Sequence, residues 1–247
     1  MQPQKTVLVL GATSDIGRAV ALVYASAGFR VLMAARRLPA AERDARDIGI
    51  RTGAKLDLIS FDVLRTETFQ DFVNGLPTLP DTVVCVVGEL GDQQRAQVDL
   101  EHAAAIMRTN FEGPALLLGL LAERLIARGS GVLVGVSSVA GDRGRGSNYV
   151  YGAAKAGFTA FLSGLRNRLT ASGVHVLTVK PGFVRTRMTA NMKLPPVITA
   201  EPDEVARAIY RAAETRRANV VYVRPVWRLI MTVIQLMPEW IFKRLRL

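Results

Sequence analysis

The chain has 247 residues, of which 49% are hydrophobic, so it is long and apolar enough to bury the core of one large domain. Its formal charge of +11 comes from scattered Lys and Arg rather than a basic tail, a pattern that argues against nucleic-acid binding. The single cysteine, Cys85, excludes an internal disulfide, and we expect no metal site. The N-terminus lacks a signal-peptide core and no apolar run reaches the length of a membrane span, so we expect a cytoplasmic protein.

Apolar runs typical of buried strands alternate with helical stretches along the chain. Such alternation predicts a single-domain, Rossmann-type, doubly wound α/β fold, with a parallel sheet of about seven strands and helices on both faces. We assign this domain to residues 1–224 and treat 225–247 as an amphipathic C-terminal tail. The predicted strands are Val7–Leu10, Arg30–Ala35, Leu56–Phe61, Thr82–Val87, Val132–Val136, Val174–Val179 and Val220–Val223. The clearest predicted helices are Asp15–Ala27, Ala103–Arg128, Tyr149–Ser172 and Asp203–Arg216.

A glycine-marked turn joins the first strand to the first helix. It runs from Gly11 to Gly17 through Ala-Thr-Ser-Asp-Ile. Small residues let a backbone approach a pyrophosphate, and the free N–H groups of a helix N-terminus favour an anion. The spacing is not G-x-G-x-x-G, so a plain turn without a ligand is the alternative. Its place in the first strand–helix unit favours a dinucleotide site.

Two arginines follow the second strand, where NAD-binding folds usually carry an acid for the ribose hydroxyls. Arg36 and Arg37 occupy this place, and the next acid is Glu42. Guanidinium groups suit a 2′-phosphate, so we favour NADP, with NAD possible. The alternative is a solvated surface pair.

Tyr151 and Lys155 lie four residues apart at the start of a predicted helix, which places them on one face. An adjacent ammonium favours tyrosinate, so we expect Lys155 to lower the pKa of Tyr151 and make it a proton donor or acceptor. Ser138 follows the fifth strand, at the edge where ligands of open α/β sheets bind. Its hydroxyl is placed to hydrogen-bond the same substrate oxygen.

With these motifs in this order, the chain resembles the short-chain dehydrogenase/reductase family over nearly its whole length. Tyr151-Gly-Ala-Ala-Lys155 matches the family's active-site motif, Ser138 its catalytic serine and Asn110 its catalytic asparagine. In the family's T-G-x-x-x-G-x-G motif, Leu10 replaces the Thr and Asp15 the middle Gly. Of the family's N-N-A-G segment only the glycine is kept. The resemblance implies the catalytic residues Asn110, Ser138, Tyr151 and Lys155.

The resemblance also implies a nicotinamide cofactor site. Asp62-Val63 matches the pair whose Asp contacts adenine, and the segment from Pro181 to Thr186 matches the one that touches the nicotinamide. Hydride would then pass between the cofactor and a ketone or alcohol, with Tyr151 as acid or base. The expected cofactor-binding residues are Gly11, Thr13, Ser14, Asp15, Ile16, Gly17, Arg36, Arg37, Asp62, Val63, Gly88, Tyr151, Lys155, Pro181, Gly182, Val184 and Thr186.

Residues 185–202 match the position of a substrate loop, and their apolar and basic side chains suit an amphiphilic anionic substrate. The alternative is a loop that docks on its own core. In the tail, Trp227 and Trp240 flank an apolar stretch that cations follow, and Pro238 should break any helix. This pattern favours peripheral contact with an anionic membrane at its inner face. The alternative is burial against a partner subunit, because enzymes of this family are often homodimers or homotetramers.

The tail and Gly-Glu-Leu-Gly-Asp after the fourth strand narrow the resemblance. They are similar to the family's reductases that serve decaprenylphosphoryl ribose 2-epimerisation by reducing a 2-keto sugar on a polyprenyl phosphate. The substrate implied is a lipid-linked keto-sugar. Alternatives are a soluble reductase of another small ketone and a dinucleotide-sensing binding protein without turnover. The complete set of Ser138, Tyr151 and Lys155 argues against the last.

Overall fold

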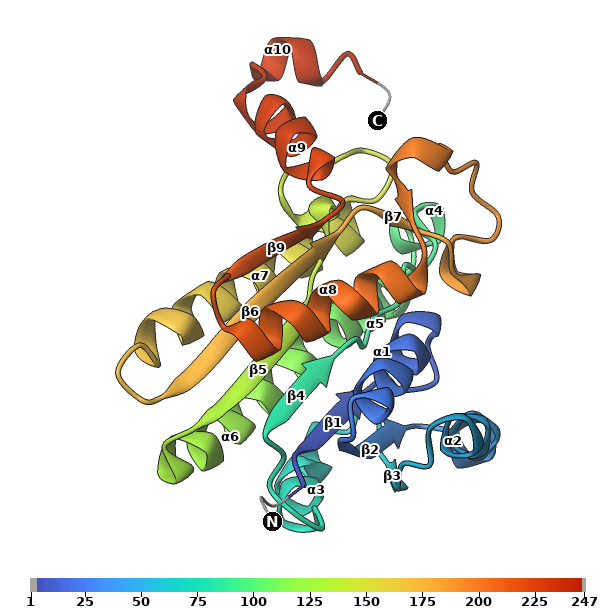
Figure 1. The fold of residues 1–247 in the computed structure, drawn as a ribbon. Coiled ribbons are helices and arrows are strands. Elements are labelled where there is room, and N and C mark those ends of the chain that lie inside the picture. The colour runs from blue at the N-terminus through green and yellow to red at the C-terminus, as the bar shows by residue number, and fades with distance from the viewer. Residues whose placement is uncertain (1–3, 246–247) are drawn as a thin grey trace.

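One parallel sheet organises the chain, which a computed structural model describes over residues 4–245. The strand order is β3-β2-β1-β4-β5-β6-β9, and every neighbouring pair is parallel, as predicted (Figure 1). In the central register, Leu8 of β1 lies between Leu32 of β2 and Val83 of β4. The strands are β1 Thr6–Leu10, β2 Arg30–Ala35, β3 Leu56–Ser60, β4 Thr82–Cys85, β5 Gly131–Val136, β6 Val174–Pro181 and β9 Val220–Val223. Phe183–Val184 (β7) and Thr199–Ala200 (β8) form a separate short pair.

Helices cover both faces of the sheet, because the central strands are apolar on both sides. Val7 and Val9 of β1 face one core, with α1, α2 and α8, while Leu8 and Leu10 face the other, with α3, α6 and α7. These helices are α1 Asp15–Ser26, α2 Leu38–Thr52, α3 Phe69–Asn74, α6 Gly113–Arg128, α7 Tyr149–Arg168 and α8 Pro202–Thr215. Shorter ones are α4 Gln93–Ala96, α5 Leu100–Met107 and the one-turn segments Thr66–Thr68, Val139–Gly141, Arg187–Thr189 and Pro196–Ile198.

The long helix predicted over Ala103–Arg128 is divided in the structure. A π-helical segment, Arg108–Glu112, separates α5 from α6. At the start of α6, Gly113 passes so close to Val63 that a Cβ atom would lie 2.2 Å from the Val63 carbonyl oxygen. The local backbone is therefore set by a contact with another element, and π-helical turns of this kind are frequent at functional sites.

The C-terminal tail forms two helices, α9 (Val226–Leu236) and α10 (Glu239–Phe242), with Pro238 at the predicted break. The inner face of α9 docks on the domain, because Trp227 and Met231 are buried against Val139. Trp227→Ala should leave a cavity at this contact. We expect it to lower the free energy of unfolding by about 3–5 kcal/mol, as truncation of buried Trp side chains does. Within residues 4–245, no helix is long and apolar enough to cross a bilayer.

Candidate active site

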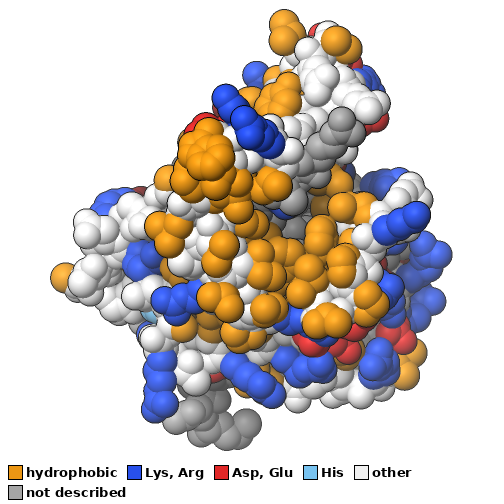
Figure 2. All heavy atoms as spheres, turned by 90° about the horizontal axis from the view of Figure 1, so that it is seen from above, with side chains coloured by type: hydrophobic (Ala, Val, Ile, Leu, Met, Phe, Trp, Pro, Cys, Tyr) orange, Lys and Arg blue, Asp and Glu red, His pale blue; other side chains and the backbone are white. Residues whose placement is uncertain are grey.

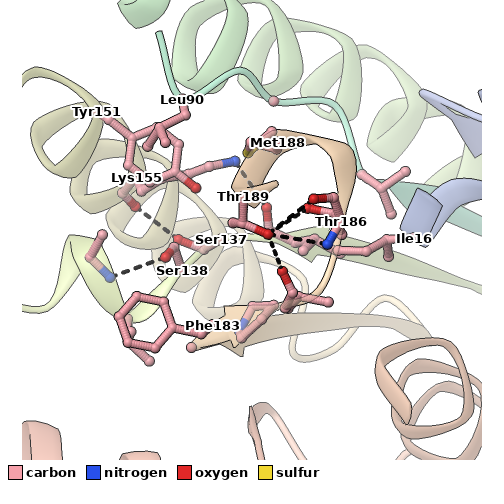
Figure 3. A pocket seen from close by; sticks show the side chains of 18 of the residues that line it. Ile16, Leu90, Ser137, Ser138, Tyr151, Lys155, Phe183, Thr186, Met188 and Thr189 are labelled. Atoms are coloured by element: carbon pink, nitrogen blue, oxygen red, sulfur yellow. Dashed lines mark hydrogen bonds between the residues drawn. The ribbon is translucent and has the colours of Figure 1, made fainter. Parts of the chain in front are cut away.

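A cavity of about 350 Å³ lies at the carboxyl ends of β1, β4, β5 and β6. Parallel strands bring their following loops to this edge, so segments far apart in sequence meet there (Figure 3). Eleven of the residues expected from the sequence line the cavity: Ser14, Asp15, Ile16, Gly88, Ser138, Tyr151, Lys155, Pro181, Gly182, Val184 and Thr186. The structure therefore brings the phosphate turn and the catalytic residues to one pocket.

Tyr151 and Lys155 project from the first two turns of α7 into this cavity (Figure 3). The Lys155 ammonium is 5.8 Å from the centre of the Tyr151 ring and donates a hydrogen bond of 3.2 Å to the Val136 carbonyl. Ser137 also holds α7 in place, because its hydroxyl donates a hydrogen bond of 3.0 Å to the Lys155 carbonyl. Lys155 is only 3% exposed, so its charge is largely removed from water.

The pKa of Tyr151 is shifted in the opposite direction from the one expected. Burial raises the pKa of Tyr151 above its usual value, although a hydrogen bond with Ser138 and the Arg145 cation act in the opposite direction. Burial also lowers the pKa of Lys155 to about 8. The expectation that Lys155 brings the pKa of Tyr151 towards neutrality is therefore wrong for this pocket, because desolvation outweighs the neighbouring charges.

Ser138 is held at the end of β5 by a short rigid segment. Its hydroxyl accepts a hydrogen bond of 3.1 Å from the Ala140 N–H. Asp142, four residues on, is fixed by the Lys180 ammonium at 2.5 Å and the Tyr222 hydroxyl at 2.9 Å. These contacts tie the serine segment to β6 and β9, so Ser138 has little freedom to turn away from the pocket.

Asn110 lies behind the cavity wall, in the π-helical segment, and is fully buried. Its amide donates to the carbonyls of Glu89 at 2.7 Å and Ile106 at 2.9 Å, and its oxygen accepts from the Glu89 N–H at 3.2 Å. A Cβ atom on Gly88 would lie 2.9 Å from that oxygen and 3.2 Å from the Lys155 ammonium. Glycine at position 88 therefore lets Asn110 and Lys155 approach each other.

The turn after β1 has the geometry of a phosphate cradle. Gly11 has a φ of +84°, and a Cβ atom on Gly17 would lie 2.3 Å from the Gly11 carbonyl oxygen. Ser14 caps α1 by accepting the Gly17 N–H at 3.0 Å. Ser14, Asp15 and Ile16 at this helix N-terminus line the cavity, a placement that suits a dinucleotide pyrophosphate.

Asp15 links this turn to the substrate loop. Its carboxylate accepts hydrogen bonds from the Arg187 backbone N–H at 2.7 Å and from the Arg187 guanidinium at 3.0 Å. The same guanidinium also donates to the Thr13 carbonyl at 2.5 Å. The negative charge that Asp15 adds near the expected phosphates is thus balanced by a cation from the loop.

Seven expected cofactor residues do not line the cavity. Gly11, Thr13 and Gly17 belong to the turn after β1, and the other four lie at the β2 and β3 end of the same edge. Arg36 and Arg37 follow β2, are exposed, and form no salt bridge with any residue from 4 to 245. Asp62, after β3, accepts the Leu64 N–H at 3.0 Å, and Val63 is buried. Their positions fit the adenosine end of an extended dinucleotide.

Several residues that line the cavity carry no signal in the sequence motifs and were not predicted. Leu90, Phe183 and Trp227 make apolar walls, and Arg145 and Asn148 add polar groups. Trp227 was expected at a membrane or subunit surface, but its indole N–H donates to the Ile198 carbonyl at 2.9 Å inside the domain. Only docking of the tail reveals this role, whereas Arg145 and Asn148 precede the Tyr151 motif closely enough to have been considered.

Comparison with known proteins decides the family. The model of the short chain dehydrogenase family matches residues 5–195. The chain belongs to the short-chain dehydrogenase family. Membership confirms the expectation of an NAD(P)-dependent oxidoreductase, and it agrees with the arrangement of Ser138, Tyr151 and Lys155 in the pocket.

The similar short-chain dehydrogenases include proteins without an assigned substrate. An uncharacterised oxidoreductase of Streptomyces coelicolor is 35% identical over 98% of this chain and 96% of its own length. Another, from Mycobacterium tuberculosis, is 42% identical over 66% of this chain, and the match spans 65% of that relative. A solved structure described as a putative NAD(P)-dependent gluconate 5-dehydrogenase of Beutenbergia cavernae, with bound NADP, has a TM-score of 0.83. It is 24% identical and covers 92% of this chain and 98% of its own, which shows the shared fold.

Proposed function

We propose that the chain is an NADP-dependent oxidoreductase that interconverts a ketone and an alcohol. The observation that carries the proposal is the meeting of Ser138, Tyr151 and Lys155 on one wall of a cavity that also receives the phosphate turn. When bound, the cofactor supplies or accepts the hydride. The residues of the chain hold the substrate oxygen and exchange its proton.

Tyr151 is the proposed proton donor in reduction. Its raised pKa keeps the phenol protonated at neutral pH, so it is ready to donate to the oxygen of a ketone that gains hydride. Ser138 hydrogen-bonds the same oxygen and stabilises its developing charge. Lys155 places a buried cation behind the tyrosine and would hold the nicotinamide ribose. Asn110, which hydrogen bonds to Glu89 and Ile106 hold in place, would position the path along which the proton moves.

The choice of NADP rests on Arg36 and Arg37, which are exposed at the end of β2 and form no salt bridge within the described part of the chain. Solved structures of similar fold from Beutenbergia cavernae and Sphingobium yanoikuyae are described with NADP and NADPH, which supports the choice. We expect Arg36→Asp to weaken NADPH binding by about 10–100-fold, because a charge-assisted phosphate contact is replaced by repulsion. Titration of the parent and the variant with NADPH and NADH measures this. A parent that prefers NADH would contradict the choice of NADP.

For the substrate we propose an amphiphilic ketone, a keto-sugar on a polyprenyl phosphate. The cavity offers apolar walls from Phe183, Met188 and Trp227 beside the catalytic hydroxyls. Figure 2 views the molecule from the tail side and shows hydrophobic side chains gathered over this face. The resemblance to the reductases of polyprenyl-linked pentoses supports the same substrate. A cofactor-oxidation screen of ketone classes that includes a polyprenyl-phosphate keto-pentose tests it, and turnover of small ketones alone would contradict it.

We further propose that the tail contacts the inner face of a membrane. The outward residues Leu229, Val233 and Leu236 follow one another on α9 at intervals of four and three, Trp240 lies on α10, and each of the four is at least half exposed. This is the spacing of one helical face, and Lys243 and Arg244 follow it. Burial of the same stripe in a homodimer or homotetramer is the competing arrangement.

Liposome flotation with anionic vesicles tests membrane contact. We expect the double variant Leu229→Gln, Leu236→Gln to lose most of the recovery that the parent shows, because two exposed apolar anchors are removed. Ile50→Gln, which removes an 80% exposed apolar side chain from α2, is the matched control. Equal recovery of parent and double variant, with a change in oligomeric mass instead, would assign the stripe to a subunit interface. Point substitutions are preferable to deletion of 227–247, because deletion also removes the pocket wall of Trp227.

A further inference from the structure

Buried polar atoms without a partner gather at the start of α7. Among the residues from 4 to 245, four buried side-chain nitrogen or oxygen atoms make no hydrogen bond, and three of them belong to Gln93, Arg145 and Asn148. Buried polar groups are nearly always paired, so such atoms require an explanation. Three in one place indicate a site that a ligand completes.

These three residues adjoin the first turn of the helix that carries Tyr151. Gln93 accepts the Val150 N–H at 3.1 Å, which leaves its amide nitrogen Nε2 as the unpaired atom. Asn148 immediately precedes α7, and its N–H donates to the Arg145 carbonyl at 3.1 Å. Arg145 and Asn148 both line the catalytic cavity. The unpaired atoms of Arg145 and Asn148 therefore belong to residues of the pocket that holds Tyr151, and Gln93 adjoins them through Val150.

The charge of Arg145 has no counterpart in the described chain. The other pocket arginine, Arg187, is paired with Asp15, whereas Arg145 makes no salt bridge with any residue from 4 to 245. Its Nε is buried and unbonded, so part of its hydration has been lost without compensation. The N-terminus of α7, a helix of 20 residues, adds positive potential at the same point.

We propose that Arg145, with Gln93, Asn148 and the N-terminus of α7, binds a phosphate ester that the substrate carries next to its reacting carbonyl. This subsite deepens the proposed function and rests on it. A phosphate has enough acceptor oxygens for the Arg145 fork and for the Gln93 amide, while the Asn148 oxygen takes a substrate hydroxyl. The phosphate is expected next to the reacting carbonyl because Arg145 and Asn148 line the same cavity as Tyr151.

Dihydroxyacetone phosphate and dihydroxyacetone form a matched pair of probes, since they differ only by a phosphate on the carbon next to the ketone. We expect calorimetric titration of the chain saturated with NADP⁺ to show tighter binding of the phosphorylated ketone. Arg145→Gln should weaken that binding at least about 10-fold and leave dihydroxyacetone unaffected, because one charge-assisted contact is lost. Arg145→Lys should restore part of it. Arg211→Gln, an exposed arginine of α8, controls for net charge.

The alternatives give distinct results. A parent without preference for the phosphorylated ketone, or an Arg145→Gln variant that retains it, overturns the subsite. Weaker NADP⁺ binding by Arg145→Gln, with an unchanged ketone preference, would assign the arginine to the cofactor instead. Loss of NADPH oxidation with both ketones, in equal measure, would make Arg145 a residue that only tunes Tyr151. An Arg145-dependent preference in a chain that oxidises no NADPH with any ketone would keep the subsite and refute the proposed function.

Discussion

Replacing Tyr151 with phenylalanine should lower ketone reduction by about 10²–10⁴-fold, because the substrate oxygen loses its positioned proton donor. The ring is retained, so the packing of α7 and the binding of NADPH should change little. Steady-state oxidation of NADPH with a turned-over ketone measures the loss. Tyr149→Phe is the matched control, since Tyr149 lies two residues away on the same helix and is 45% exposed. Unchanged turnover in Tyr151→Phe would refute the assignment of the acid.

The pH dependence of ketone reduction should follow from the pKa values of Tyr151 and Lys155. The raised pKa of Tyr151 keeps its proton in place at neutral pH, while the ammonium of Lys155, with a pKa of about 8, loses its charge above that value. Reduction should therefore be level below about pH 8 and decline above it. A rate that rises steadily through this range would show that the deprotonated forms are the active ones.

Replacing Lys155 with methionine should abolish most activity and yet stabilise the chain without ligand. The lysine is 3% exposed, and its pKa falls from 10.5 to about 8 because the buried ammonium is desolvated. A shift of this direction disfavours the folded state at neutral pH, by an amount we place at about 1–3 kcal/mol after allowing for the hydrogen bond to Val136. Chemical denaturation at pH 7 should show a higher free energy of unfolding for Lys155→Met.

The advantage of the methionine variant should shrink as pH rises. Below pH 8 the folded and unfolded chains both carry the Lys155 proton, so the full penalty of burying the charge is present. Between about pH 8 and 10.5 the folded chain has lost this proton and the unfolded chain still holds it, so the wild type gains stability relative to the variant. A variant less stable than the wild type at pH 7 would show that Lys155 is well solvated or paired.

Local sequence was enough to predict the elements whose residues interact mainly with sheet neighbours or with their own turn. Five of the seven strands, β1, β2, β4, β5 and β6, are runs of mostly buried residues. The turn after β1 needs glycine because Gly11 has a positive φ and Gly17 lies against the Gly11 carbonyl oxygen. Helix α2 was missed because only Ala41 and Ile48 of its fifteen residues are buried, which leaves little apolar periodicity to detect. The π-helical segment before α6 was missed because it depends on contact with Val63.

The residues of the candidate site could be predicted from the sequence, but the direction of their pKa shifts could not. Tyr151, Lys155 and Ser138 follow from spacing and position, but the direction of the Tyr151 pKa shift depends on how much water the folded pocket excludes. Arg145 is singled out because no acidic side chain among residues 4–245 forms a salt bridge with it, and no local sequence pattern predicts this. Trp227 likewise belongs to the pocket only because α9 packs with its inner face on Val139.

Because every strand of the sheet points the same way, the last one, β9, ends at the rim where the active site lies (Figure 1). Whatever sequence follows Val223 is delivered to the mouth of the pocket without a crossing connection. In this chain the extension supplies both Trp227, inside the cavity, and the outward stripe of α9. Substitutions in this C-terminal extension can therefore change both the size of substrate that the pocket accepts and the surroundings from which the substrate enters. They can do so without altering the sheet.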